Sequence, residues 1–500
     1  MEYKNQQRIP KAVPRLIIHG GAGNIQPENF SPEKYSQYRE ALLTITSQTE
    51  VYMHTPIATK SKGAEHTREP TALEIAVHAV TLLEDNPLFN SGHGAVFTRD
   101  GINELEASVM VSRGKAKRGV GVTGLRRVKN PILLAQKMLE HGEDDLTGKS
   151  DLGWSSSRDA GDGVNLDIPS AQGHTLIHGP SAEILAEKYG LELAEPGYFF
   201  TRTRWDEHVR AREREKKSRI HFATWSADEY LPQGTCGAVA LDSDGVLCCA
   251  TSTGGMTNKL TGRIGDTPSV GAGFWAEEWS EQVVASSSPT ARASGMSISD
   301  YAPLWWKHLA WPGRAISDLR TGLVGGLCYS DCLPGQPQYS PLSREQATTT
   351  KTVTRSVAVS GTGNGDSFLR LAAAHAVVSM ARWAAIPAGE ALRRVAGRGG
   401  ALQKSADNRW SKTGEGEGGM IGIESTREEA QAEEGGRGGG STVVSSKILH
   451  DFNCGGMFRA WIDDEGNHRM KIWDHVADEQ DLLRKHAEPP GSEKGQVRVG

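Results

Sequence analysis

The central part of the chain holds the side chains best suited to chemistry. Gly234 and Thr235 open an apolar segment, a hydroxyl-rich turn containing Thr253 follows it, and Arg263 and Asp266 come next in a glycine-rich stretch. A Gly-Thr pair at the start of a strand is ordinary by itself, but its combination with these later residues is not. The combination favours a threonine nucleophile that becomes a chain terminus by self-cleavage, so that its own α-amine serves as base for its hydroxyl.

An α-amino group suits that task because its pKa of about 7.7–8.0 lies close to working pH. Thr253 lies on the return strand of an expected hairpin, where it either hydrogen-bonds Thr235 or acts only as a turn hydroxyl. Arg263 offers a planar fork to a carboxylate, and Asp266 accepts hydrogen bonds from an ammonium group. The two are suited to gripping the backbone of an amino acid, although such residues also occur as surface ion pairs.

A second candidate feature is the glycine-rich turn at 360–366, which runs into an expected helix. Backbone N–H groups gather at such a turn and suit either a phosphate or an oxyanion. No P-loop lysine accompanies the turn, so its GxGxG string is weak evidence for a nucleotide site.

The elements that must position these residues follow from hydrophobic periodicity and turn signals. We expect a strand at 16–19, helices at 71–85, 181–189 and 368–383, and hairpins around 242–245 and 464–466. Polar or low-complexity stretches indicate insertions at about 47–70, 141–172, 280–354 and 424–445, a linker at about 206–234 and a mobile tail at 478–500. This segregation of strands and helices predicts an α+β fold rather than a parallel βαβ sheet.

Composition narrows the classes of function. The formal net charge of −5 gives no basic field for nucleic acid. The six cysteines form no paired CxxC array, and Cys328 and Cys332 lack nearby histidines, so we expect no zinc site. The polar N-terminus has no signal-peptide pattern and no stretch is apolar enough to span a membrane, so we expect a cytoplasmic protein with reduced thiols.

Seven segments, taken together, resemble the plant-type asparaginase/isoaspartyl peptidase family of N-terminal nucleophile hydrolases. In chain order they are 16–23 (LIIHGGAG), 86–99 (NPLFNSGHGAVFTR), 198–205 (YFFTRTRW), 234–242 (GTCGAVALD), 251–273, 357–370 and 452–459. The resemblance implies a four-layer αββα sandwich with large loop insertions. It also implies self-cleavage between Gly234 and Thr235 into an α subunit, 1–234, and a β subunit, 235–500, which together form one domain.

The resemblance also implies a role for each matching residue. It makes Thr235 the nucleophile, Thr253 the residue that orients it, and the Thr362 hydroxyl with the Gly363 N–H the oxyanion hole and part of the substrate site. Asn90 matches an asparagine near the nucleophile.

Arg263 and Asp266 match the substrate clamp. His93 is expected to be structural, because the family needs no histidine base. Three positions of the glycine-rich turn depart from the family pattern. Asp366 replaces a glutamate of the relatives, and Gly361 and Asn364 stand where relatives often have small or hydroxyl residues. These departures affect the fine geometry of the oxyanion hole.

Backbone carbonyls near Leu83, Glu84 and Phe89 match a loop that holds a sodium ion in relatives, and no other cofactor is implied.

The function implied is hydrolysis of β-aspartyl amide bonds, in L-asparagine and in isoaspartyl dipeptides, by a dimer of αβ heterodimers acting on small molecules. Glycosylasparaginase and threonine aspartase-like endopeptidase are alternatives on the same fold. The first usually enters the secretory route, and the second is expected to lose the Arg263–Asp266 clamp. A degenerate, non-catalytic binding protein is the alternative of another class, because the insertions are large.

Overall fold

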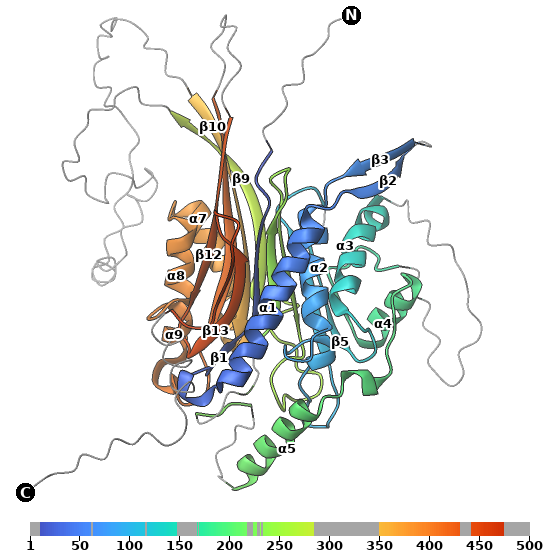
Figure 1. The fold of residues 1–500 in the computed structure, drawn as a ribbon, viewed down its shortest axis with the longest axis vertical. Coiled ribbons are helices and arrows are strands. Elements are labelled where there is room, and N and C mark those ends of the chain that lie inside the picture. Colours follow the sequence, from blue (N-terminus) through green and yellow to red (C-terminus); the bar gives the residue numbers. More distant parts are fainter. Residues whose placement is uncertain are drawn as a thin grey trace, which may run out of the picture.

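A computed structural model describes the chain at residues 11–61, 64–115, 118–147, 168, 170–217, 224–227, 231, 234–284, 350–430 and 442–474. The described residues build a mixed α+β fold in which two main sheets are accompanied by helices (Figure 1). Cys328, Cys332 and the predicted tail at 478–500 lie outside these ranges.

The larger sheet has eight strands in the order β14-β13-β1-β7-β8-β4-β5-β6, antiparallel except for the β5–β6 pair. The smaller sheet has four antiparallel strands in the order β12-β11-β10-β9, and β2 and β3 form a separate hairpin. The strands are β1 (Arg15–Gly23), β2 (Ile57–Ser61), β3 (Ala64–Arg68), β4 (Leu105–Val111), β5 (Gly119–Leu125), β6 (Leu176–His178), β7 (Cys236–Leu241), β8 (Leu247–Thr253), β9 (Phe274–Val284), β10 (Thr350–Gly363), β11 (Gly418–Ala430), β12 (Thr442–Phe452), β13 (Gly456–Ile462) and β14 (His468–Lys471).

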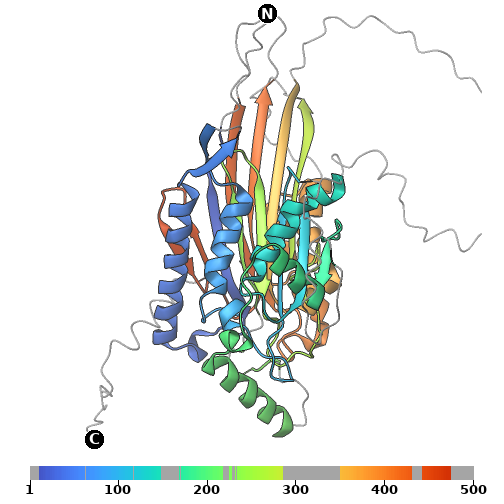
Figure 2. The ribbon, with the colours of Figure 1, turned by 90° about the vertical axis from the view of Figure 1, so that its right-hand side faces the viewer.

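Helices cover the outer side of each main sheet. The helices are α1 (Pro32–Met53), α2 (Ala72–Glu84), α3 (Pro131–Thr147), α4 (Gly179–Lys188), α5 (Arg202–Lys217), α6 (Gly365–Leu371), α7 (Ala373–Trp383), α8 (Ala388–Ala396) and α9 (Ala401–Ala406). In both views α1, α2 and α3 lie beside the larger sheet, whereas α7 and α8 pack on the smaller one (Figures 1 and 2).

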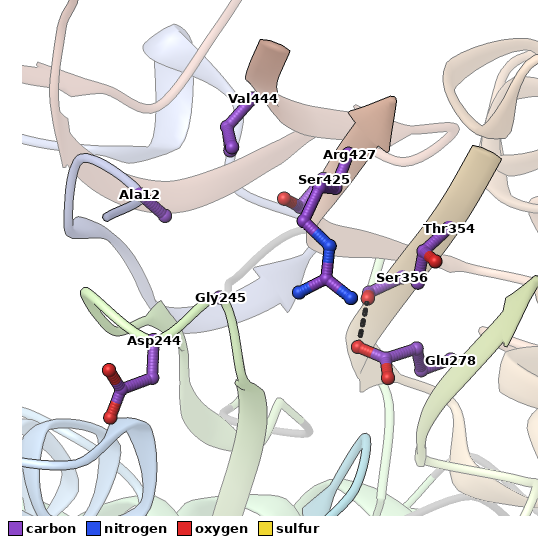
Figure 3. Close-up of a pocket in the computed structure, with 9 residues that line it drawn as sticks. All are labelled: Ala12, Asp244, Gly245, Glu278, Thr354, Ser356, Ser425, Arg427 and Val444. Atoms are coloured by element: carbon purple, nitrogen blue, oxygen red, sulfur yellow. Dashed lines mark hydrogen bonds between the residues drawn. The ribbon is translucent and has the colours of Figure 1, made fainter. Parts of the chain in front are cut away.

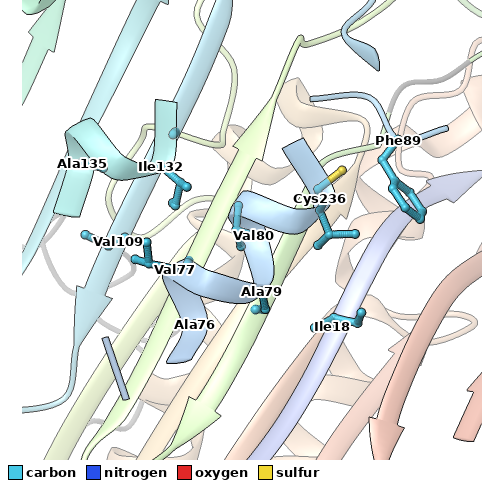
Figure 4. Packing of buried hydrophobic residues seen from close by; sticks show 14 of the residues in the cluster. Ile18, Ala76, Val77, Ala79, Val80, Phe89, Val109, Ile132, Ala135 and Cys236 are labelled. Atoms are coloured by element: carbon cyan, nitrogen blue, oxygen red, sulfur yellow. The ribbon is translucent and has the colours of Figure 1, made fainter. Parts of the chain in front are cut away.

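Successive side chains of a strand point to opposite faces of its sheet, so the apolar strands of this protein bury side chains on both faces. Leu16 and Ile18 of β1 point toward the helices and join the apolar cluster around α2, seen in Figure 4. Ile17, between them, joins a separate cluster that includes Val239 of β7 and Ile421 of β11, from the facing sheet. A third cluster fills the space between the smaller sheet and α7 and α8. These sequence-distant strands are therefore held together mainly by buried apolar surface.

Several sequence expectations are confirmed in outline. The strand at 16–19 is the core of β1, and the helix predicted from Thr71 is α2, with Thr71 as its N-cap in a capping box with Glu74. The 181–189 helix is α4, and both expected hairpins exist, with Gly245 and Gly466 at the positive φ angles that their turns need.

Three expectations for the first half were wrong. The insertion predicted at 47–70 is the last turns of α1 followed by the β2–β3 hairpin, because Ile45, Thr49 and Met53 continue the buried stripe of α1. Residues 141–147 of the insertion predicted at 141–172 belong to α3. Much of the linker predicted at 206–234 is helix α5, where charged residues pair along the helix, as in Arg202–Asp206.

Corrections also apply to the second half. The outer ends of the insertions predicted at 280–354 and 424–445 are strand: β9 runs to Val284, β10 starts at Thr350, and β11 runs to Ala430. Charged residues form ion pairs between neighbouring strands here, as Lys351 of β10 does with Glu428 of β11. The single helix predicted at 368–383 is two helices, since Ala372 adopts a left-handed conformation between α6 and α7.

Candidate active site

Thr235 is buried at the entrance to β7, where the ends of several strands meet. Its backbone N–H donates to Thr362 Oγ1 at 2.9 Å, and its own Oγ1 lies 2.9 Å from Thr267 Oγ1. The two neighbouring strands β1 and β8 pair with β7, and β10 reaches it from the facing sheet. A weak hydroxyl nucleophile is thus fixed by contacts from three separate segments.

Gly234 is held just before Thr235 in a space that admits no side chain. A Cβ at this position would lie 2.5 Å from Gly21 Cα, 2.6 Å from the Ala22 nitrogen and 2.7 Å from Thr362 Oγ1. Its carbonyl oxygen accepts a hydrogen bond from Asn90 Nδ2 at 3.1 Å. The peptide bond before Thr235 is therefore confined sterically, and its carbonyl is polarised by a fixed donor.

Asn90 occupies the position that the sequence pattern assigned near the nucleophile. Besides Gly234, its Nδ2 donates to the Gly255 carbonyl at 2.6 Å, and its Oδ1 accepts from the Val96 N–H at 3.0 Å. Every polar atom of this buried amide is satisfied, so its orientation is fixed.

Thr253 ends β8, one residue beyond the Cys236–Ser252 pair of the β7–β8 ladder. Its hydroxyl accepts from the Gly255 N–H at 2.9 Å. Among the described residues, the hydroxyl that bonds Thr235 Oγ1 is that of Thr267 rather than that of Thr253. Thr267 was not singled out from the sequence, although it directly follows Asp266 in the same glycine-rich stretch.

Thr362 and Gly363 lie at the end of β10, and Thr362 is fully buried. Gly363 has φ of +139°, and a Cβ there would lie 2.4 Å from the Glu417 carbonyl oxygen. The next residue, Asn364, caps α6 by accepting from the Ser367 N–H at 3.1 Å. Only glycine fits this tight, left-handed turn, and the hydroxyl of Thr362 just before it contacts the Thr235 N–H.

Arg263 and Asp266 both reach the backbone of Gly365. A Cβ at Gly365 would lie 2.4 Å from Asp266 Oδ1 and 3.0 Å from Arg263 Nη2. Within the described part of the chain, Asp266 Oδ2 and Arg263 Nη2 are buried without a hydrogen-bond partner, although Arg263 makes an ion pair with Asp366 at 3.3 Å. The site therefore holds one anionic and one cationic group whose bonding capacity is unfilled.

Burial sets the charge state of this pair. Loss of hydration raises the pKa of Asp266 to about 7, and the nearby Arg263 guanidinium opposes that rise. Glu106, also buried, accepts from the Gly265 N–H and holds the loop between the two residues. An incoming ammonium group would relieve the cost of an ionised Asp266.

Comparison with known proteins supports the identity that this geometry indicates. A sequence model of a family described as asparaginase matches residues 12–151 and 168–288, just over half of the chain. The chain belongs to the asparaginase family. It is accordingly an enzyme of the N-terminal nucleophile hydrolase type.

The alignments of this chain with individual members of the asparaginase family span most of each member's length. The isoaspartyl peptidase of Escherichia coli (strain K12) is 35% identical over 294 residues, 59% of this chain and 77% of that protein. The plant-type L-asparaginase of Pyrococcus furiosus is 34% identical over 267 residues, 53% of this chain and 70% of that protein. The isoaspartyl peptidase/L-asparaginase of Danio rerio is 30% identical over 268 residues, 53% and 67% respectively.

The loop that follows α2 is the one whose carbonyls, by analogy with the asparaginase family, would face a sodium ion. The Glu84 carbonyl oxygen lies 2.4 Å from where a Cβ of Gly92 would stand, and those of Phe89 and Pro87 lie 2.1 and 2.7 Å from that of Gly94. Glycine is therefore required at both positions, and the Phe89 carbonyl accepts a hydrogen bond from the Ser91 N–H at 2.9 Å. The Leu83 carbonyl is engaged by the Asn86 N–H at 3.3 Å.

Side chains around this loop are buried and polar. Burial raises the pKa of Glu84 to about 8, and Ser252 Oγ donates to its carboxylate at 2.6 Å. The ring of His93 packs against that of Tyr198, with the ring centroids 4.9 Å apart. The described residues contain no group of three or more His, Cys, Asp or Glu side chains placed to hold a metal.

His19 is a buried histidine that the sequence did not single out. Its Nε2 lies 2.7 Å from Ser360 Oγ, and burial lowers its pKa to about 3. A Cβ at Gly237 would lie 2.4 Å from that Nε2, so the ring fits tightly behind the nucleophile strand. A neutral imidazole here joins β1 to β10 by a hydrogen bond between the two main sheets.

A cavity at the other end of the sheets is separate from this site. It is lined by the turn between β7 and β8, which is at the opposite end of β7 from Thr235, and by residues of the smaller sheet. One of these is Ser356, whose Oγ donates to Glu278 at 3.0 Å (Figure 3).

None of the helices in the described part of the chain has the length and apolar character needed to cross a membrane.

Proposed function

We propose that this chain is an autoprocessing hydrolase of β-aspartyl amide bonds, which converts L-asparagine to L-aspartate and ammonia and cleaves isoaspartyl dipeptides. The observation that carries the proposal is that Arg263 and Asp266 hold buried polar atoms without hydrogen-bond partners among the described residues, and that Asp266 directly precedes Thr267, whose hydroxyl lies 2.9 Å from Thr235 Oγ1. The names of the related proteins, isoaspartyl peptidase and L-asparaginase, support this substrate class.

The clamp is matched to an aspartyl group. Arg263 would hold the α-carboxylate as a charge-assisted pair, and Asp266 would hold the α-ammonium group. With both ends fixed, the side-chain carbonyl is left to reach Thr235. Positioning of this kind lowers the barrier because the reacting atoms are held close before reaction.

Self-cleavage is the first of the proposed reactions. Thr235 Oγ attacks the Gly234 carbonyl carbon, the C–N bond breaks as the α-amine leaves, and the resulting ester is hydrolysed by water. Asn90 Nδ2, 3.1 Å from the Gly234 carbonyl oxygen, is placed to stabilise the charge that develops on that oxygen. The products are residues 1–234 and 235–500, with the α-amine of Thr235 free.

Catalysis then uses the new terminus. The α-amine takes the proton from Thr235 Oγ as the oxygen attacks the substrate carbonyl, and the proton passes to the departing amine or ammonia. Thr362 accepts a hydrogen bond from the Thr235 nitrogen, which leaves its hydroxyl hydrogen to donate to the oxyanion together with the Gly363 N–H. Thr267 orients the nucleophile through its contact with Thr235 Oγ1, while Thr253 holds the turn after β8 through Gly255. Water releases the acyl group as aspartate.

The finer assignments belong to the same proposal. The two sheets with helices on their outer sides support a four-layer αββα sandwich made jointly by the two fragments. Leu83, Glu84 and Phe89 would contribute the loop that holds a structural sodium ion through backbone carbonyls, a role that steadies Asn90. A dimer of αβ pairs and a cytoplasmic location complete the proposal.

The test combines two assays on the purified full chain. Ammonia release from L-asparagine and amino-acid release from isoaspartyl dipeptides are both expected, with intact mass showing a fragment that begins at Thr235. Thr235→Ala is expected to remain a single chain and to be inactive. An uncut chain with full amidase activity would refute the mechanism.

A further inference from the structure

Before the cleavage point, residues 224–227 form a stretch with defined hydrogen bonds, and Leu231, nearer Thr235, is buried with Ala211 of α5. The 224–227 stretch lies against a groove of about 460 Å³ that both halves of the chain line: Asn24 and Gln26 come from the part before Thr235, and Glu417 and Asn453 from the part after it. The groove is separate from the Arg263–Asp266 clamp, and none of its residues takes part in the proposed chemistry.

Three contacts hold this stretch. Asn24 Nδ2 donates to the carbonyl oxygens of Ser226 at 3.1 Å and Ala227 at 2.9 Å. The indole N–H of Trp225 donates to Glu417 Oε2 at 3.3 Å. Ser226 is buried, Trp225 is half-buried and Ala227 is exposed.

The groove is shaped for the indole ring. Gly414, with φ of +76°, approaches Trp225 so closely that a Cβ there would lie 2.3 Å from the ring carbon Cδ1. A glycine is needed at this position both for the left-handed backbone and for the ring to seat. Burial raises the pKa of Glu417, and the hydrogen bond from Trp225 opposes that rise.

Glu417 also connects the groove with the nucleophile. Its carbonyl oxygen accepts from the Asn364 N–H at 2.8 Å, and the adjoining Gly363 packs against the same carbonyl. The seven residues from Ala227 to Gly234 span at most about 25 Å when extended. Holding Ala227 on Asn24 and Trp225 on Glu417 therefore limits the space that Gly234 can explore.

We propose that residues 225–227 form an anchor that positions the Gly234–Thr235 bond for self-cleavage. The proposal rests on the self-cleavage proposed above. Without the anchor, Leu231, buried with Ala211 of α5, would be the remaining described point of attachment before Gly234. With one attachment fewer, the chain would populate the confined conformation of Gly234 less often. Trp225 is thus a positioning residue of maturation, with no part in turnover.

The experiment follows cleavage of newly made full-length chain over time by intact mass, in wild type, Trp225→Ala and Asn24→Ala. Cleavage is expected to slow at least about tenfold in each variant, since small misplacements of reacting atoms commonly cost that much or more. Once cut, Trp225→Ala is expected to have the wild-type kcat and KM for asparagine. Trp383→Ala, which removes an exposed tryptophan of α7, is the matched control and is expected to cut at the wild-type rate.

Folding is tested separately by comparing thermal unfolding of Trp225→Ala and its parent in an uncut Thr235→Ala background. Trp225→Phe keeps a ring against Gly414 but loses the N–H bond to Glu417, and intermediate slowing is expected. If the wild type is cut and Trp225→Ala is cut equally fast, the anchor is refuted while the proposed function stands. A wild-type chain that never cuts would refute the proposed maturation, and the anchor with it.

Discussion

Replacing Arg263 with alanine tests the substrate clamp most directly. The side chain is largely buried, and its ion pair is with Asp366, whose side chain is 58% exposed. An exposed partner of that kind contributes no more than about 1 kcal/mol, so we expect replacement of Arg263 to affect substrate binding more than stability.

The expected magnitude follows from the burial of the site. Truncating one partner of a buried, hydrogen-bonded charge pair costs about 2–5 kcal/mol. At about 1.36 kcal/mol for each factor of ten, Arg263→Ala should lower kcat/KM for asparagine by roughly 30- to 5,000-fold. Most of the loss should fall on KM, because the α-carboxylate does not react. Self-cleavage should persist, since it involves no substrate carboxylate.

The assay is ammonia release over a wide range of asparagine concentrations, with intact mass to confirm cleavage. Arg370→Ala is a matched control, because Arg370 lies on α6 near the site but pairs with Glu415 on the surface. Arg263→Lys keeps the charge and loses the planar fork, so it should fall between the two. An unchanged KM in Arg263→Ala would remove this residue from the clamp.

Four further outcomes are expected. KM for asparagine should rise as pH falls below about 7. Burial raises the pKa of Asp266 to about 7, and the carboxyl must be ionised to bind the substrate ammonium group. The Asp266→Asn enzyme should bind asparagine weakly, and its KM should show no such pH dependence. Gly234→Ala should stay uncut on denaturing gels, because its Cβ would clash with the β1 backbone, and prompt cutting would contradict that packing. Thr267→Val should lower kcat more than KM by removing the hydroxyl that contacts Thr235, and an unaltered kcat would argue against that contact. Replacing 424–430 with Gly/Ser should lower the Tm, because these residues pair with β10 and β12; an unchanged Tm would show that the pairing contributes little.

Local sequence signals were sufficient for some elements and misleading for others. The capping box at Thr71 and the glycine turn at Gly245 act within a few residues, so α2 and the β7–β8 hairpin could be predicted. The charged segment after 206 and the Glu-rich stretch after 424 looked like loops because their polarity is local. Their structure comes from partners elsewhere: buried Arg204 of α5 donates to the Leu88 carbonyl at 2.6 Å, and β11 pairs with β10 and β12.

The same division holds for the candidate site. Spacing and resemblance singled out Asn90 and Thr362, which contact the Gly234–Thr235 junction in the structure. They gave no sign of Thr267 as the hydroxyl partner of Thr235, of His19 behind the strand, or of Trp225 in its groove. Those contacts join positions far apart in the chain.

The sequence by itself determined the chemical inventory of this protein: a Gly-Thr junction, an arginine and an aspartate for a zwitterion, and a glycine turn for an oxyanion. Only the tertiary structure decided which of these groups meet, which remain unpaired and how burial shifts their charge. The pKa of Asp266 is the clearest case, because it is set by the loss of water and by the distance to Arg263. Both are properties of the packed sheets, and no single segment of the chain contains them.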